Sequence, residues 1–185
     1  GRIAINLIGD AFSDALRQQA IDGIRQQLGQ VDLVIYSLAS GLRVLPDGTQ
    51  VRSVLKTTGQ PFSGWGLDLE QDALVQQSLA PATPEEIRDT VTVMGGEDWQ
   101  LWLQALQQAD CLAPGVQTVA YSYIGPESTY PLYRDGTIGY AKEHLHATAE
   151  TINLQLAELG GHAWVSVCKA LVTKASAYIP VLPVY

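Results

Sequence analysis

The sequence predicts an α/β protein with a doubly wound parallel sheet, and three observations support this fold class. Short apolar runs rich in β-branched residues recur along the 185 residues, and segments with helical periodicity separate them. The runs are almost continuously apolar, which is typical of parallel strands that are covered by helices. Strand and helix alternate at a spacing that favours βαβ units.

Three segments form the predicted sheet. They are residues 31–38, 115–123 and 162–168. β-Branched and aromatic side chains are enriched in each of them, as expected for strands. Since apolar residues occupy consecutive positions, we expect both faces of these strands to be buried.

Helical patterns fill the intervals between the predicted strands. The predicted helices are residues 13–28, a helix that starts at Pro84, residues 98–112 and residues 137–159. In the first helix, apolar residues recur at three- and four-residue spacing, with Gln and Arg on the opposite side. Thr83 is the expected N-cap of the second helix, and Pro84 occupies its first position. Glycine pairs at 95–96 and 160–161 interrupt or end the helical pattern.

A β-hairpin interrupts the alternation after the first strand. Residues 43–55 read as a strand, a turn at Pro46-Asp47-Gly48 and a second strand. Residues 60–69 are rich in glycine and aromatic side chains, and we expect an ordered loop there. No internal repeat and no linker composition is found, so residues 1–185 are predicted to form a single core.

Composition excludes several classes of function. Nineteen acidic residues against eleven basic ones give a formal net charge of −8, and no basic run occurs, which disfavours a nucleic-acid partner. We expect no membrane span, because no apolar stretch is long enough, and the first residues do not resemble a signal peptide. The two cysteines, Cys111 and Cys168, form no paired motif, so we expect a reducing, cytoplasmic location.

Neither a metal site nor a hydrolase site is indicated. His144 and His146 are two residues apart on a predicted helix and therefore point in different directions. His162 follows a glycine pair that ends a helix, where surface histidines are common. Metal sites need three or four converging ligands, and the sequence has no Gly-x-Ser-x-Gly turn of the kind that carries a serine nucleophile. We expect no bound metal.

The glycine fingerprint of dinucleotide-binding proteins is missing, although the predicted fold is one that binds dinucleotides. No Gly-x-Gly-x-x-Gly run follows a predicted strand. Read alone, this absence argues against a nucleotide cofactor, but the first predicted strand begins only at Val31, and the βα unit that normally carries the fingerprint could lie upstream of Gly1.

Residues 121–142 contain the side chains best suited to chemistry. They follow the carboxyl end of a predicted strand, where doubly wound sheets bind ligands, and they place Lys142 nine positions after Tyr133. An ammonium lowers the pKa of a nearby phenol, and that phenol can then donate a proton to a developing oxyanion. The alternative is a tyrosine-rich loop that packs on the sheet edge beside a solvated Lys142. The spacing alone favours this alternative.

Six blocks of sequence point to a known family. They are residues 9–14, 32–40, 52–56, 93–100, 121–142 and 169–173. In these blocks, in family order and across nearly the whole chain, the sequence closely resembles the FabV/trans-2-enoyl-CoA reductase family. The resemblance implies an extended Rossmann fold similar to that of short-chain dehydrogenases. It also implies NADH-dependent reduction of the 2,3 double bond of enoyl thioesters, as in fatty acid synthesis.

The resemblance also implies roles for individual residues. Tyr133 matches the family's proton donor, Lys142 its cofactor-contacting lysine, and Tyr123 a tyrosine that contacts the substrate. The positions that match cofactor-lining residues are Asp10, Ala11, Leu38, Ala39, Leu171, Val172 and Thr173. The implied substrate is an enoyl-CoA or an enoyl-acyl carrier protein, the implied cofactor is NADH, and we expect a monomer.

Two departures from the family matter. Its members are considerably longer, and their N-terminal glycine-rich phosphate loop and C-terminal helices have no counterpart here, so the chain resembles the middle of a reductase. Tyr130 stands where the family has tryptophan. Two alternatives stay open. One is a non-catalytic piece of the fold that cannot hold NADH, since backbone amides at a helix N-terminus supply much of the pyrophosphate binding. The other is a related oxidoreductase that acts on a ketone or an alcohol.

Overall fold

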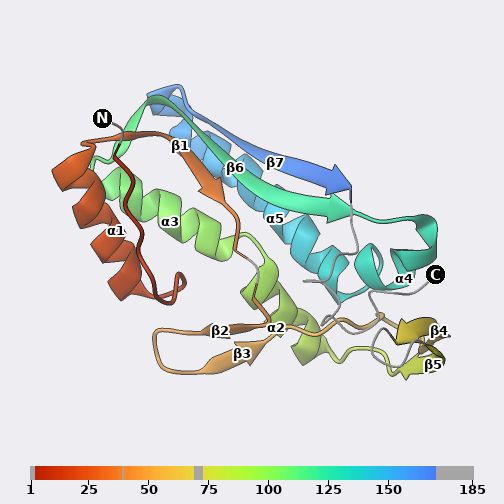
Figure 1. Ribbon diagram of the computed structural model, residues 1–185. Coiled ribbons are helices and arrows are strands. Elements are labelled where there is room, and N and C mark those ends of the chain that lie inside the picture. Colours follow the sequence, from red (N-terminus) through yellow and green to blue (C-terminus); the bar gives the residue numbers. More distant parts are fainter. Residues whose placement is uncertain (1–2, 39, 69–72, 170–185) are drawn as a thin grey trace.

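A parallel sheet forms the centre of the fold (Figure 1). The computed structural model describes residues 3–38, 40–68 and 73–169. Strands β1 (Val31–Tyr36), β6 (Leu112–Ile124) and β7 (His162–Lys169) lie in the order β1-β6-β7, and both pairings are parallel. The predicted α/β class is therefore confirmed, and each of the three predicted strands is present.

The longer helices begin where the sequence signals them. They are α1 (Asp14–Gln27), α2 (Pro84–Met94), α3 (Glu97–Gln108) and α5 (Thr137–Leu156). The side chain of Ser13 caps α1, and Thr83 forms a capping box with Glu86 at the start of α2. The helix predicted for residues 98–112 ends early, because the chain turns at Asp110, whose φ of 56° is left-handed, and then enters β6.

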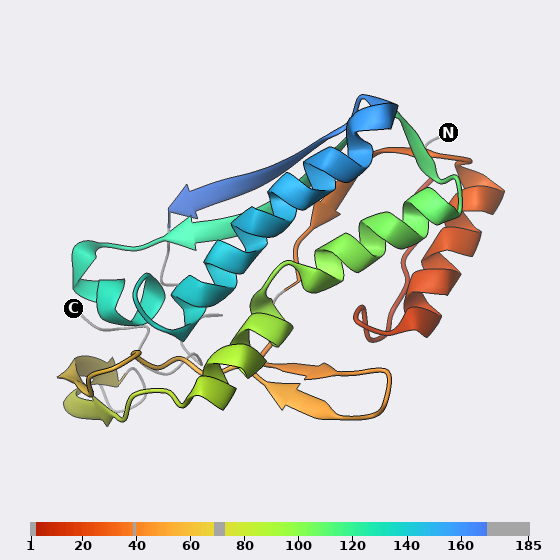
Figure 2. The same cartoon turned by 180° about the vertical axis from the view of Figure 1, so that it is seen from behind.

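Helices α3 and α5 both lie on one face of the sheet, which Figure 2 shows from behind. On that face, Val116, Thr118 and Ala120 of β6 are fully buried. On the opposite face, about half of each of four large residues is exposed: Leu33, Ile35, Tyr121 and Trp164. The prediction that the strands are buried on both faces is therefore wrong for the described residues, because α3 and α5 pack on the same side.

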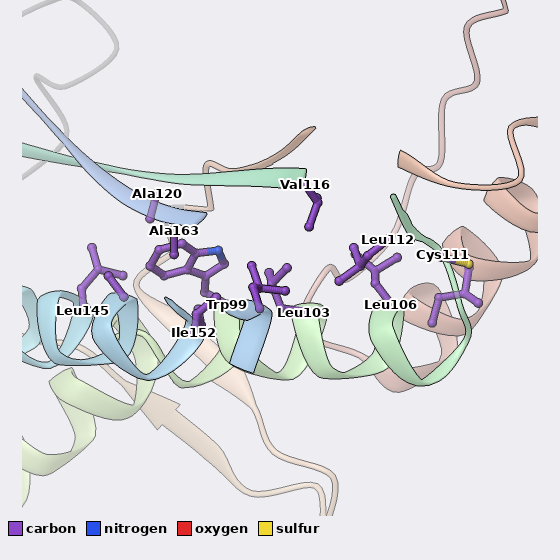
Figure 3. Packing of buried hydrophobic residues seen from close by; sticks show 13 residues of the cluster. Trp99, Leu103, Leu106, Cys111, Leu112, Val116, Ala120, Leu145, Ile152 and Ala163 are labelled. Carbon is purple, nitrogen blue, oxygen red and sulfur yellow. The ribbon is translucent and has the colours of Figure 1, made fainter. Parts of the chain in front are cut away.

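The core lies between the sheet and these two helices (Figure 3). Trp99 and Leu103 of α3 and Ile152 of α5 are fully buried in it. The indole Nε1 of Trp99 donates to Thr118 Oγ1 at 2.9 Å, and that hydroxyl donates to the carbonyl of Val34 at 3.0 Å. Since these buried polar atoms have partners, the indole adds apolar area to the core without an unsatisfied donor.

The Leu103→Ala variant tests this placement of the core. Leu103 is 0% exposed, so the change is expected to lower the free energy of unfolding by about 2–5 kcal/mol through lost apolar burial and a residual cavity. Urea denaturation of the two proteins measures the difference. Leu154→Ala is the control, because Leu154 of α5 is 80% exposed and its loss should cost less than about 0.5 kcal/mol. Equal decreases in the free energy of unfolding for the two variants would contradict the placement of Leu103 in the core.

Two antiparallel hairpins accompany the sheet. Strands β2 (Leu42–Val44) and β3 (Gln50–Arg52) form the hairpin predicted for residues 43–55, with Gly48 at a φ of 86° in its turn. Strand β4 (Phe62–Asp68) pairs with β5 (Ala73–Leu79), so the prediction of a loop over residues 60–69 is wrong. The glycines that suggested a loop instead allow close packing, since a Cβ on Gly66 would lie 3.0 Å from Gln77 Nε2.

Candidate active site

The segment that carries the predicted catalytic residues follows β6. The chain leaves this strand, forms the 3-10 helix η1 (Glu127–Thr129) and the short helix α4 (Tyr130–Tyr133), and then begins α5. Figure 1 shows α4 beyond the carboxyl ends of β6 and β7. This is the edge at which parallel α/β sheets bind ligands.

Tyr133 is buried in a small apolar cluster with Leu132 and Ile138, and only 7% of it is exposed. Its ring centre lies 5.9 Å from that of Tyr123 at an interplanar angle of 62°, which is an edge-to-face contact. The Tyr133 hydroxyl is buried and has no hydrogen-bond partner among the described residues. Because a buried hydroxyl without a partner costs free energy, this atom is suited to a partner that a ligand supplies.

Lys142 of α5 contacts both tyrosines. Its Nζ donates to the main-chain carbonyl of Tyr123 at 2.6 Å and to that of Tyr133 at 3.4 Å. The same ammonium lies 4.0 Å from the centre of the Tyr123 ring, a cation–π distance. The structure therefore brings together the three residues to which the resemblance gives catalytic and substrate-binding roles.

Burial shifts the pKa values of all three groups. It raises the pKa of Tyr133 well above the usual range, with a smaller contribution from the neighbouring Tyr123, whose own pKa burial also raises. Burial lowers the pKa of Lys142 to about 8. The expectation that Lys142 lowers the pKa of Tyr133 is not met, because the ammonium contacts the carbonyl of Tyr133 and not its hydroxyl. A phenol that stays protonated at neutral pH is still suited to donate a hydrogen bond.

Two hollows meet at Tyr123 and Lys142, which line both of them. The first has a volume of about 220 Å³ and is bounded by the end of β1 and by the residues that follow it, including Leu38. The second has a volume of about 310 Å³ and is bounded by Tyr133 and Arg134. Two hollows that share the same lysine and tyrosine suit two ligands that must react with each other.

The other predicted cofactor residues have different positions. Asp10 and Ala11 lie in the turn before α1, where the carbonyl of Ala11 accepts a hydrogen bond from Trp102 Nε1 at 3.1 Å. Ala11 and Leu38 line a further hollow of about 370 Å³ along β1, so Leu38 borders both this hollow and the one next to Lys142. Four of the predicted residues lie outside the described part of the chain: Ala39, Leu171, Val172 and Thr173.

A buried charge cluster beside the site was not predicted from the sequence. Asp98 is 2% exposed and accepts hydrogen bonds from Arg17 Nη2 at 2.9 Å and from the Tyr36 hydroxyl at 3.2 Å. Burial raises the pKa of Asp98, and the positive charge of Arg17 opposes this shift. Tyr36 ends β1 and lines the hollow next to Lys142. An acidic residue in the first turn of a helix is common at the surface because the helix dipole stabilises it there, so Asp98 is not recognisable from the sequence as part of a buried cluster.

The histidines make contacts that need no metal. His144 Nδ1 accepts a hydrogen bond from the backbone N–H of Gly96 at 3.0 Å, and His146 and His162 are exposed. Within residues 3–38, 40–68 and 73–169, no group of three or more His, Cys, Asp or Glu side chains is placed to bind a metal ion. In the same ranges, no helix has both the length and the apolar character needed to span a bilayer.

Comparison with curated proteins finds relatives with named activities. An enoyl-[acyl-carrier-protein] reductase [NADH] of Photobacterium profundum is 53% identical over 187 residues, which cover 100% of this chain and 47% of the relative. Another, from Vibrio cholerae, is 53% identical over 186 residues, which cover 100% of this chain and 46% of the relative. The chain thus spans about half the length of the curated relatives that it matches.

Solved structures and a family model agree with these relatives. The trans-2-enoyl-CoA reductase of Clostridium acetobutylicum in complex with NAD has a TM-score of 0.91 at 46% identity, over 99% of this chain and 47% of that one. The Treponema denticola enzyme in complex with NAD has a TM-score of 0.89 at 48% identity, over 97% of this chain and 45% of that one. The model of the trans-2-enoyl-CoA reductase catalytic region matches residues 1–185. The resemblance seen in the sequence is therefore confirmed, and the chain belongs to the trans-2-enoyl-CoA reductase family.

Proposed function

We propose that the protein reduces the double bond between C2 and C3 of trans-2-enoyl thioesters with NADH, as a step of fatty acid synthesis. One observation carries this proposal: the buried Tyr133 hydroxyl has no partner among the described residues and lies in the same cluster as Tyr123 and Lys142. The printed names of the relatives support the substrate class and the reductant. The thioester is carried by CoA or by an acyl carrier protein.

The described residues fit a dinucleotide. Leu38 borders two adjoining hollows at the end of β1, and Lys142 offers an ammonium where one of these hollows meets the Tyr133 cluster. We assign the binding of NADH to Lys142 together with Asp10, Ala11, Leu38, Ala39, Leu171, Val172 and Thr173. When bound there, NADH supplies the hydride that adds to C3 of the enoyl group.

Tyr133 and Tyr123 act on the thioester. As the hydride adds, negative charge develops on the thioester oxygen, and the Tyr133 hydroxyl donates a hydrogen bond to that oxygen. The raised pKa keeps Tyr133 protonated and able to donate. Tyr123 lines the hollow beside Tyr133 and forms a wall for the substrate. Tyr133 then supplies the proton that adds to C2 and is itself reprotonated from solvent, which leaves the saturated thioester.

An assay with two thioesters tests this function. The full-length protein is incubated with NADH and either crotonyl-CoA or acetoacetyl-CoA, and the loss of NADH absorbance is followed. We expect turnover with crotonyl-CoA, whose double bond is reduced, and little with acetoacetyl-CoA. A preference for acetoacetyl-CoA would favour the ketone reductase instead. Absence of both turnover and NADH binding would favour a non-catalytic protein.

The cofactor preference is a separate prediction. Asp10 is an exposed carboxylate in a turn assigned to cofactor binding, and it would repel the 2′-phosphate that distinguishes NADPH from NADH. We expect kcat/KM for NADH to exceed that for NADPH by about tenfold or more, a difference of about 1.4 kcal/mol. Asp10→Asn should lower the ratio of kcat/KM for NADH to kcat/KM for NADPH. Comparable efficiency with the two cofactors in the unaltered protein would refute the preference.

The organisation of the protein is also proposed. Residues 1–185 form one Rossmann-like catalytic core of a longer reductase that acts as a monomer in the cytoplasm. Two free thiols support a reducing location, since Cys111 is buried and Cys168 is exposed without a disulfide partner among the described residues. Light scattering on the purified full-length protein measures its mass in solution, and a dimer mass would contradict the monomer.

A further inference from the structure

A short extended segment passes across the start of α5, close to Tyr133. We name residues 54–57 the strap. On one side it contacts α2, where the N–H of Val54 donates to Thr90 Oγ1 at 3.1 Å. On the other side it contacts α5, where the carbonyl of Lys56 accepts from the N–H of Thr137 at 2.9 Å. The strap therefore connects two helices that are far apart in the sequence.

The hydroxyl of Thr137 binds the strap at two points. Thr137 is 0% exposed, and its Oγ1 donates to the carbonyl of Val54 at 2.5 Å and accepts from the N–H of Lys56 at 3.3 Å. These two backbone groups flank Leu55. A hydroxyl with both its donor and its acceptor capacity in use fixes the backbone on either side of that leucine.

Leu55 carries this constraint to the active site. It packs against the cluster of Leu132, Tyr133 and Ile138. The strap also packs closely against Gly136. A Cβ on this glycine would lie 2.5 Å from the carbonyl oxygens of both Lys56 and Leu132. The strap is thus held tightly against the turn that joins Tyr133 to α5.

We infer that Thr137 is a positioning residue for the reduction: its hydroxyl fixes the strap, and the strap holds Leu55 against the cluster that contains Tyr133. This inference rests on the proposed function, because it assigns the role of proton and hydrogen-bond donor to Tyr133. The hydrogen bonds of the Thr137 hydroxyl are to Val54 and Lys56 of the strap and not to Tyr133. A displacement of a reacting group by about 1 Å can lower turnover about a hundredfold, so a loosened strap is expected to affect kcat.

Isosteric and conservative variants of the full-length protein test the inference. Thr137→Val keeps the shape and removes the hydroxyl, and we expect kcat with crotonyl-CoA to fall about tenfold, within the range for a misplaced group, while KM for NADH changes less than about twofold. Thr137→Ser keeps the hydroxyl and should restore kcat. Thr148→Val is the matched control, because Thr148 is also a buried threonine of α5 but its hydroxyl donates to the carbonyl of His144 in the same helix.

A second variant and a second measurement separate positioning from general stability. Leu55→Ala removes the packing of Leu55 against the cluster of Leu132, Tyr133 and Ile138 and leaves the hydroxyl of Thr137 in place, so it should also lower kcat. The double variant should lose no more than the larger single loss, since the two residues act in series. Hydrogen exchange at the amide of Lys56 should be faster in Thr137→Val and unchanged in Thr148→Val.

The outcomes are distinguishable from failure of the proposed function. An unaltered protein that does not reduce crotonyl-CoA would overturn the proposed function, and the role of Thr137 with it. An active protein in which Thr137→Val speeds exchange at Lys56 but keeps kcat within about twofold would overturn the positioning role alone. Equal losses of kcat in Thr137→Val and Thr148→Val would also overturn it, because they would track stability and not the strap.

Discussion

Tyr133→Phe in the full-length protein is expected to lower kcat for crotonyl-CoA by about a hundred- to a thousandfold, the usual cost of removing one preorganised donor to an oxyanion. The variant keeps the ring and its edge-to-face contact with Tyr123. The hydroxyl that it removes is buried and has no partner among the described residues, so the melting temperature should stay the same or rise. Steady-state kinetics and thermal melting of the same preparations measure both effects.

Two further tyrosine variants serve as comparisons. Tyr140→Phe is the control, because Tyr140 of α5 lies between Tyr133 and Lys142 in the sequence but is 45% exposed. The turnover of this variant should be unchanged. Tyr123→Phe distinguishes the roles of the two clustered tyrosines. If Tyr123→Phe lost turnover while Tyr133→Phe kept it, the assignment of the donor would be reversed. If neither mattered, the tyrosines would serve packing only.

Lys142→Met is expected to weaken NADH binding as well as turnover, which sets it apart from Tyr133→Phe. A hydrogen bond from a charged group contributes about 1.5–3 kcal/mol, so the dissociation constant for NADH should rise about ten- to a hundredfold. Methionine keeps most of the length and apolar stem of lysine, which limits the loss of packing. Titration of NADH fluorescence measures binding directly. Unchanged affinity would show that the lysine does not hold the cofactor.

The same residue predicts how NADH binding depends on pH. Burial lowers the pKa of Lys142 to about 8, so the ammonium is charged below that pH and becomes neutral as the pH rises through it. Bound NADH adds negative charge and raises this pKa, which means that affinity should fall with rising pH from about pH 8 upward. In Lys142→Met this decline should be absent. An identical decline in the variant would assign the titration to another group.

Much of the fold could be predicted because local chemistry determines it. The apolar runs of β1, β6 and β7 and the cap at Thr83 are signals carried by a few adjacent residues, and all of them appear in the structure. Strands β4 and β5 were not predicted. Gly64 and Gly66 weaken the strand pattern of β4, and the close packing of these glycines is visible only once β4 is paired with β5. Whether both sheet faces are covered depends on where the helices pack, which periodicity does not show.

The candidate active site also has features that the sequence predicts and features that it does not. The spacing of Tyr133 and Lys142 could be read from the sequence, but the contact of the ammonium with two carbonyls could not, because it depends on the path of α4 into α5. The burial of Asp98 against Arg17 joins residues 81 positions apart. The hydrogen bonds of Thr137 to the strap likewise join distant segments. Tertiary contacts of this kind leave no local pattern.

A crystal structure of the full-length protein with NAD⁺ and crotonyl-CoA is the most direct test of the proposed active site. We predict that the Tyr133 hydroxyl lies within hydrogen-bond distance of the thioester oxygen and that Lys142 Nζ contacts the cofactor. The acyl chain should occupy the hollow bounded by Tyr123, Tyr133 and Arg134. A thioester bound elsewhere, with the Tyr133 hydroxyl still buried and without a partner, would contradict the account.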